Sequence, residues 1–111
     1  MTTDELLMKL AHSLSRLVSI LSLDQQCSWT SKFDSDLERC QRLMREGHSV
    51  TDLTSLSASV TQVFQGMGSF NDYAPGIYDP SSGQYSAIFG TEDFDVVSKE
   101  VFDLAILLRV S

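Results

Sequence analysis

Apolar side chains recur with a helical period through the first part of the chain. Leucines and one valine are spaced one, three and four residues apart, which places them on one broad face of a helix. They are Leu6, Leu7, Leu10, Leu14, Leu17, Val18 and Leu21. The run Thr2-Thr3-Asp4-Glu5 has the order of a capping box, in which a Thr hydroxyl and the Glu5 side chain satisfy free backbone amides. The pattern predicts a helix from about Thr3 to Leu23.

Two further helices are expected next. The second runs from Asp24, a good N-cap residue, to Gly47, because glycine is favoured just after a helix end. Its apolar stripe carries two large aromatic rings and consists of Trp29, Phe33, Leu37, Cys40 and Met44. The third helix runs from about Thr51 to Gln65, and Ser49 and Asp52 have the spacing of an N-terminal cap. Its many Ser and Thr residues have low helix propensity, so the prediction depends on the cap and the apolar positions.

Residues 66–90 differ in composition from the helical segments. They contain five of the six glycines, both prolines and all three tyrosines. Ala74-Pro75-Gly76 and the stretch from Asp79 to Gly83 are turn signals. One interpretation is a short hairpin in which Ile77-Tyr78 pairs with Tyr85-Ile88. The aromatic content favours an ordered insertion, and insertions of this length are commonly functional.

A fourth helix is expected from about Glu92 to Val110. Thr91 is the predicted N-cap, and the acids of the first turn suit the positive end of the helix dipole. Its core stripe consists of Phe94, Val97, Val101, Leu104, Ala105 and Leu108. The sequence therefore predicts an all-α, four-helix bundle-like fold in a single helical domain, residues 1–111, with the Gly/Pro/Tyr-rich insertion before the last helix.

Negative charge is concentrated in the second half of the chain. The sequence has 15 acidic and 8 basic residues, and no Lys or Arg occurs between Arg45 and Lys99. Such a surface repels nucleic-acid phosphates and anionic lipid, so neither nucleic acid nor a membrane is expected as a partner. It attracts basic proteins, although solubility alone also explains acidic surfaces.

The sequence predicts a cytoplasmic protein. Residues 1–5 are acidic, whereas a secretory signal begins with basic residues. The first apolar stretch is interrupted by Lys9, His12 and Arg16, so it does not suit a membrane span. In a reducing compartment Cys27 and Cys40, both expected on the second helix, are free thiols.

No catalytic or metal-binding pattern is present in the sequence. His12 and His48 lack further ligands at metal spacing, and Glu92 with Asp95 provides only two carboxylates for a cation. The expectation is that the protein is not an enzyme and uses no cofactor or metal. The remaining enzyme hypothesis requires the fold to bring Asp72 and His48 together.

Tyrosines and acids alternate through the insertion and into the last helix. Tyrosine provides large contact area at protein interfaces, and flanking carboxylates accelerate encounter with a basic partner. The alternative is that the tyrosines pack the insertion onto the helices. The predicted partner-binding residues are Asp72, Tyr73, Tyr78, Asp79, Tyr85, Glu92, Asp93 and Asp95.

The motif Gly66-Met67-Gly68-Ser69-Phe70-Asn71-Asp72 resembles one in a family of small, largely uncharacterised bacterial helical domains. Those domains carry GMGS-(Phe/Leu)-(Asn/Ser)-Asp after two or three helices. The resemblance covers the layout of about the first 75 residues, and here the motif continues into Tyr73-Ala74-Pro75-Gly76 instead of an apolar stretch. It implies no catalytic residue. In size, charge and class the chain is similar to immunity proteins of bacterial toxin systems.

Two functional hypotheses follow. The first is an immunity protein that neutralises a cognate bacterial toxin by occluding a basic active-site cleft with an acidic, aromatic surface. The alternative is a regulatory or adaptor protein that binds another cellular protein, or forms a homodimer, through the apolar face of the first helix.

Overall fold

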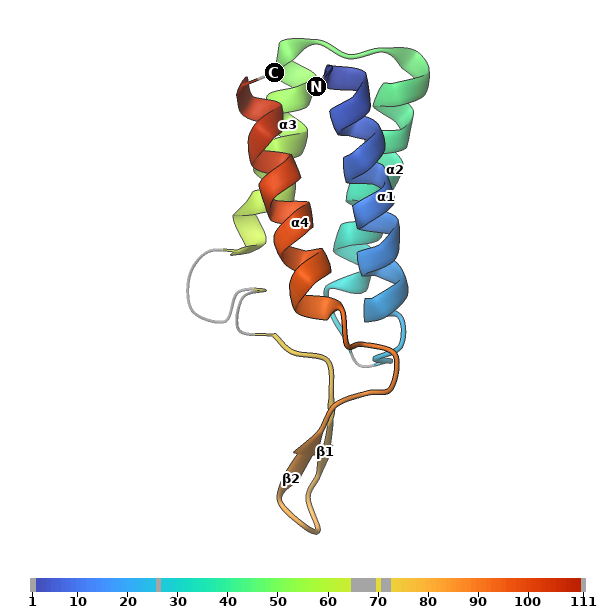
Figure 1. The fold of residues 1–111 in the computed structure, drawn as a ribbon, viewed down its shortest axis with the longest axis vertical. Coiled ribbons are helices and arrows are strands. Elements are labelled where there is room, and N and C mark those ends of the chain that lie inside the picture. Colours follow the sequence, from blue (N-terminus) through green and yellow to red (C-terminus); the bar gives the residue numbers. More distant parts are fainter. Residues whose placement is uncertain (1, 26, 65–69, 71–72, 111) are drawn as a thin grey trace.

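The computed structural model describes residues 2–25, 27–64, 70 and 73–110, and over this part of the chain it is a four-helix bundle (Figure 1). The helices are α1 (Thr3–Leu21), α2 (Thr30–Glu46), α3 (Val50–Thr61) and α4 (Phe94–Leu107). Short 3₁₀ turns extend α3 (η1, Gln62–Phe64) and α4 (η3, Leu108–Val110). Each helix packs on the next, and α4 returns to α1, so both chain ends lie at one end of the bundle. The predicted all-α, bundle-like fold is confirmed.

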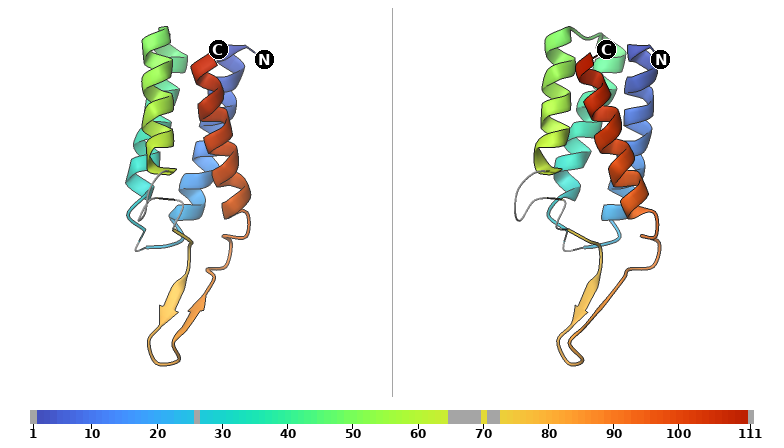
Figure 2. Two further views of the ribbon diagram at one scale, coloured as in Figure 1. Left: turned by 90° about the vertical axis from the view of Figure 1, so that its left-hand side faces the viewer. Right: turned by 60° about the vertical axis from the view of Figure 1, so that its left-hand side comes forward.

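A small hairpin extends from the opposite end of the bundle. Strands β1 (Ile77–Asp79) and β2 (Gln84–Ser86) pair antiparallel, with Tyr78 opposite Tyr85. Figures 1 and 2 show this hairpin projecting away from the helices. Ile88 lies beyond β2, because its carbonyl accepts hydrogen bonds from the amide (3.2 Å) and hydroxyl (2.6 Å) of Thr91. This turn leads the chain back into α4.

The apolar face of α1 forms the centre of the core. Its leucines at positions 7, 10, 14, 17 and 21 are fully buried, and α1 packs against both α2 and α4. Burying such a side chain stabilises the fold by roughly 1.5–3 kcal/mol. The apolar face predicted from spacings of one, three and four residues is therefore buried, and it packs against other helices of the same chain.

Two helix starts agree with the cap residues of the sequence. The Thr2 hydroxyl accepts a hydrogen bond from the Glu5 amide at 3.2 Å, which makes Thr2 the N-cap of α1. At α3 the capping box is complete: the Ser49 hydroxyl accepts from the Asp52 amide, and the Asp52 carboxylate accepts from the Ser49 amide. These bonds satisfy amides that have no partner within the helix.

The predicted start of the second helix at Asp24 is wrong. Helix α1 ends at Leu21, α2 begins only at Thr30, and Cys27 lies in the connection between them. The N-cap of α2 is Trp29, and the Asp24 carboxylate instead accepts a hydrogen bond from the Tyr73 hydroxyl at 2.7 Å. A contact with a residue far along the chain thus replaces the local cap.

Two smaller corrections concern helix faces and ends. On α2 the predicted core residue Met44 is exposed and its neighbour Leu43 is buried instead, so the buried face is shifted by one residue at the end of the helix. The last helix begins at Phe94 with Asp93 as N-cap, not at Glu92 with Thr91 as N-cap, because the Thr91 hydroxyl bonds to Ile88.

A polar network that the sequence pattern did not predict joins α2 to α3. Asp36 is 3% exposed, and its carboxylate accepts from Lys32 Nζ at 2.6 Å and from the Ser59 hydroxyl at 2.7 Å. Lys32 also donates to the Ser59 carbonyl at 2.6 Å. The buried charge is therefore both paired and hydrogen-bonded, as a charge in a protein interior must be.

Candidate functional site

The hairpin tip carries the first of the predicted binding residues that the structure places. Asp79 is exposed, and its carboxylate accepts hydrogen bonds from the Ser81 hydroxyl (2.7 Å), the Ser81 amide (3.0 Å) and the Ser82 hydroxyl (3.1 Å). Gly83 closes the turn with a φ of 70°, a conformation that favours glycine. The hydrogen bonds from Ser81, and then that from Ser82, lower the pKa of Asp79. Asp79 thus shapes the turn and keeps a negative charge at its tip.

Three more predicted carboxylates gather where the chain returns into α4. Glu92, Asp93 and Asp95 are all exposed. Glu92 accepts from the Gly90 amide at 3.2 Å, and Asp93 forms an ion pair with Arg16 of α1 at 3.8 Å. Asp95 lies in the first turn of α4, where a carboxylate suits the positive end of the helix dipole. These acids therefore form a negative segment at the hairpin end of the bundle.

An exposed aromatic ring lies in the same return segment and was not among the predicted site residues. Phe89 is 93% exposed, between hairpin strand β2 and the acids at the start of α4. Leu23, which follows α1, is 48% exposed and lies close to Gly90. A Cβ added to Gly90 would lie 3.0 Å from one of the Leu23 methyl carbons. We call Asp79, Phe89, Glu92, Asp93 and Asp95 the hairpin-end surface. The sequence signal for Phe89 was its position: an aromatic residue outside any helical stripe, directly before Gly90 and an acidic run.

Tyr73 has a different position from these exposed residues. Its ring stacks on Phe70 and meets Phe94 edge-on, with centroids 5.9 and 5.6 Å apart respectively. Its hydroxyl donates to Asp24, and burial together with this bond raises the pKa of Tyr73 above its ordinary value. Tyr73 therefore packs the insertion onto the bundle, the alternative considered for the tyrosines from sequence.

Three predicted site residues are only partly placed or not placed. Tyr78 and Tyr85 face each other in the hairpin register, but the positions of their side chains lie outside what the structure describes. Asp72 and most of the Gly66–Asp72 motif also lie outside the described residues, with Phe70 as the exception. The structure thus places the exposed acids Asp79, Glu92, Asp93 and Asp95 on the hairpin and its return segment, and places Tyr73, partly buried, against the core.

Two side chains of reactive type outside the hairpin-end surface, Cys40 and His48, make contacts that indicate a structural role. Cys40 is buried, its thiol donates to the Leu7 carbonyl at 3.3 Å, and burial raises its pKa to about 12. A thiol with so high a pKa is a poor nucleophile. His48 lies 3.2 Å from Asp4 in an exposed pair at the opposite end from the hairpin. Among the residues that the structure describes, no group of three or more His, Cys, Asp or Glu side chains could hold a metal ion.

Within the same part of the chain, every helix is too short or too polar to cross a membrane. Comparison of the chain with models of protein families, with curated proteins and with solved structures finds no match.

Proposed function

We propose that this chain is a non-catalytic immunity protein, which neutralises a cognate bacterial toxin in the cytoplasm by covering its basic active-site cleft with the hairpin-end surface. The observation that carries the proposal is the exposure of Phe89, which is followed along the return segment by three exposed carboxylates, Glu92, Asp93 and Asp95. A large aromatic ring in water costs free energy that a partner pocket recovers on binding. Aromatic anchors surrounded by charge are typical of tight, specific protein interfaces.

The charge of the surface indicates the kind of partner. Exposed carboxylates accelerate encounter with a positively charged protein and repel polyanions. A toxin that acts on nucleic acid or on another anionic substrate needs a basic cleft, and an acidic projection can occupy it. The hairpin extends beyond the bundle, the shape required to enter a cleft (Figure 2).

The alternative, self-association through the apolar face of α1, is less well supported. That face is buried against α2 and α4, so a homodimer that used it would first have to open the bundle. A regulatory or adaptor role therefore also requires some other surface, and the hairpin-end surface is the best candidate for it.

Charge reversal tests the proposal once a partner is isolated. Asp79→Lys and Asp93→Lys should each slow association about threefold to tenfold at low salt, because each replaces an attractive charge with a repulsive one. Glu46→Lys, at the exposed end of α2 away from the hairpin, is the control with the same change in net charge. Association rates measured by stopped flow or surface plasmon resonance that match in all three variants would refute the assignment of this surface.

A further inference from the structure

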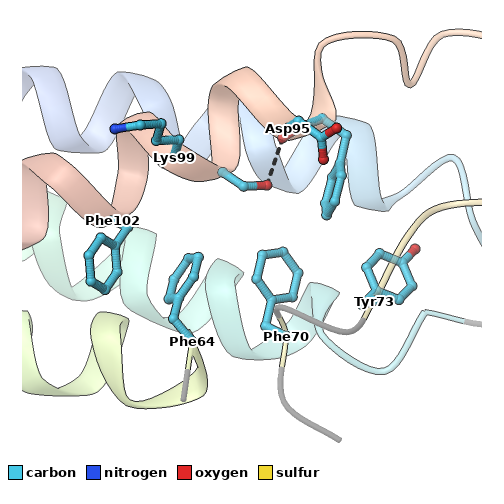
Figure 3. A pocket seen from close by; sticks show the side chains of 8 residues that line it. Phe64, Phe70, Tyr73, Asp95, Lys99 and Phe102 are labelled. Carbon is cyan, nitrogen blue, oxygen red and sulfur yellow. Dashed lines mark hydrogen bonds between the residues drawn. The ribbon is translucent and has the colours of Figure 1, made fainter. Parts of the chain in front are cut away.

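A cavity of about 310 Å³ lies beside the first two turns of α4, toward the end of α3. Figure 3 shows its walls, which consist mainly of five aromatic side chains. These are Phe64, Phe70, Tyr73, Phe94 and Phe102. The volume is at the lower end of the range for small-molecule sites, roughly 300–1,000 Å³. The cavity can therefore hold a small organic molecule.

The rings around the cavity are held in place by one another. The centroids of Phe64 and Phe102 are 5.1 Å apart, and those of Phe70 and Phe94 are 5.5 Å apart. The one hydroxyl among the α4 side chains of the wall, that of Ser98, already donates to the Phe94 carbonyl at 2.6 Å. The wall thus offers apolar surface and aromatic rings, and it favours a ligand whose inserted part is apolar.

Two exposed side chains of opposite charge line the cavity, and among the described residues only the positive one has an ion-pair partner. Asp95 and Lys99 both line it, on successive turns of α4. Lys99 Nζ lies 2.6 Å from Asp103 Oδ2, so its charge is paired along the helix. Among the described residues Asp95 has no ion pair, and its carboxylate remains beside the aromatic wall. Both a carboxylate and the faces of aromatic rings attract cations.

We propose that this cavity is a binding site for a small organic cation, an arylalkyl or alkyl ammonium. Its apolar body enters between the Phe and Tyr rings, and its ammonium group lies beside Asp95. An anion is disfavoured by the Asp95 carboxylate, because Lys99, the cation among the described lining residues, is already paired with Asp103. A neutral molecule of the same shape lacks the attraction to Asp95. The inference rests on the cavity and its charges and does not require a toxin partner, although Asp95 also belongs to the hairpin-end surface.

The fluorescence of Trp29, the sole tryptophan of the chain, provides a label-free signal for binding in this cavity. The ring of Trp29 lies edge-on to that of Phe70, a wall residue, at a centroid distance of 5.8 Å. The full chain is titrated with 2-phenylethylammonium, 2-phenylethanol and phenylacetate, three probes that share a ring but differ in head-group charge. The expected result is saturable binding in which the ammonium binds about fivefold more tightly than the alcohol, the size of one exposed ion pair, and the carboxylate binds most weakly.

Matched variants assign the effect to Asp95. Asp95→Asn should weaken ammonium binding about fivefold and leave alcohol binding unchanged. Glu46→Gln removes the same charge at the last residue of α2, at the end of the bundle away from the hairpin, and should change the affinity for neither probe. Phe102→Leu, at a half-buried wall position, should weaken all three probes, with circular dichroism confirming that the variant folds. Equal affinities for the ammonium and the alcohol, or no saturable binding by fluorescence and by ligand-observed NMR, would overturn the proposal.

Discussion

The two halves of the insertion have similar compositions but opposite surroundings. The first half contributes Phe70 and Tyr73, whose rings pack among Phe33, Phe64 and Phe94 at the end of the bundle. The second half forms the hairpin and then presents Phe89 at 93% exposure. Aromatic content alone therefore does not identify a binding surface in this chain.

The difference has a simple physical cause. Phe70 and Tyr73 of the first half lie against aromatic side chains of α2, η1 and α4, so their rings add to the apolar core there. The second half forms two strands of three residues each, which pair with each other and project away from the helices (Figure 1). A two-stranded hairpin is at best marginally stable alone, and the exposed residues of this half add little to the core. That contrast is the reason to place function in the second half.

Truncation of one aromatic residue from each half should give the largest contrast. Phe70→Ala removes a ring that is 2% exposed and should lower the free energy of unfolding by about 3–5 kcal/mol. Phe89→Ala should change it by less than about 0.5 kcal/mol, because the ring contacts water. Urea unfolding followed by circular dichroism measures both. Similar losses in the two variants would show that Phe89 is part of the core.

A smaller loss of stability is expected on removal of the Tyr73 hydroxyl, which links the first half of the insertion to Asp24. Tyr73→Phe keeps the ring stacking but removes the hydrogen bond to Asp24, and should cost about 1–2 kcal/mol. A double-mutant cycle with Asp24→Asn isolates this pair. If the two substitutions are simply additive, the Tyr73–Asp24 bond does not stabilise the fold.

A substitution in the hairpin turn should destabilise the hairpin and leave the stability of the helical bundle unchanged. Gly83→Ala has room for its methyl group, but at a φ of 70° an L side chain costs about 1–2 kcal/mol locally. Cross-strand NMR contacts between β1 and β2 should weaken while the thermal midpoint of the bundle stays the same. A lowered midpoint would mean that the hairpin and the helices unfold as one unit.

The smallest expected effect is a titration at the hairpin tip. Because hydrogen bonds lower the pKa of Asp79, its contribution to the turn is fully present above the ordinary aspartate value of 3.8 and is lost as the pH falls through the lowered value. The Ser81 amide chemical shift should report a midpoint below 3.8. In Asp79→Asn this titration should disappear. A midpoint at or above 3.8 would contradict the hydrogen-bonded turn.

Local sequence rules predicted the helices better than their junctions. The starts of α1 and α3 followed from Thr2 and from the Ser49–Asp52 pair, because cap bonds join residues three apart. The start of α2 did not, because Asp24 bonds to Tyr73, 49 residues further along the chain. Pairing at such a distance depends on the assembled fold and leaves no periodic signal.

The candidate site shows the same limit: the sequence alone does not predict contacts between residues far apart along the chain. Charge counting selected Asp79, Glu92, Asp93 and Asp95, which are exposed as expected for a binding surface. It could not separate Tyr73 from Phe89, since burial of either ring depends on which half of the insertion reaches the bundle end. Nor could it anticipate the buried Asp36, whose partners Lys32 and Ser59 come from two different helices.

The most direct test of the account is a capture experiment with three baits from lysate of the native host. The baits are the wild-type chain, Phe89→Ala, and Val50→Ala, which truncates another exposed apolar side chain, 74% exposed, at the start of α3. The account predicts that the wild type and Val50→Ala retain one basic protein at low salt and release it at high salt, whereas Phe89→Ala does not retain it. Equal recovery with all three baits, or recovery of the chain alone, would contradict a binding role for the hairpin-end surface.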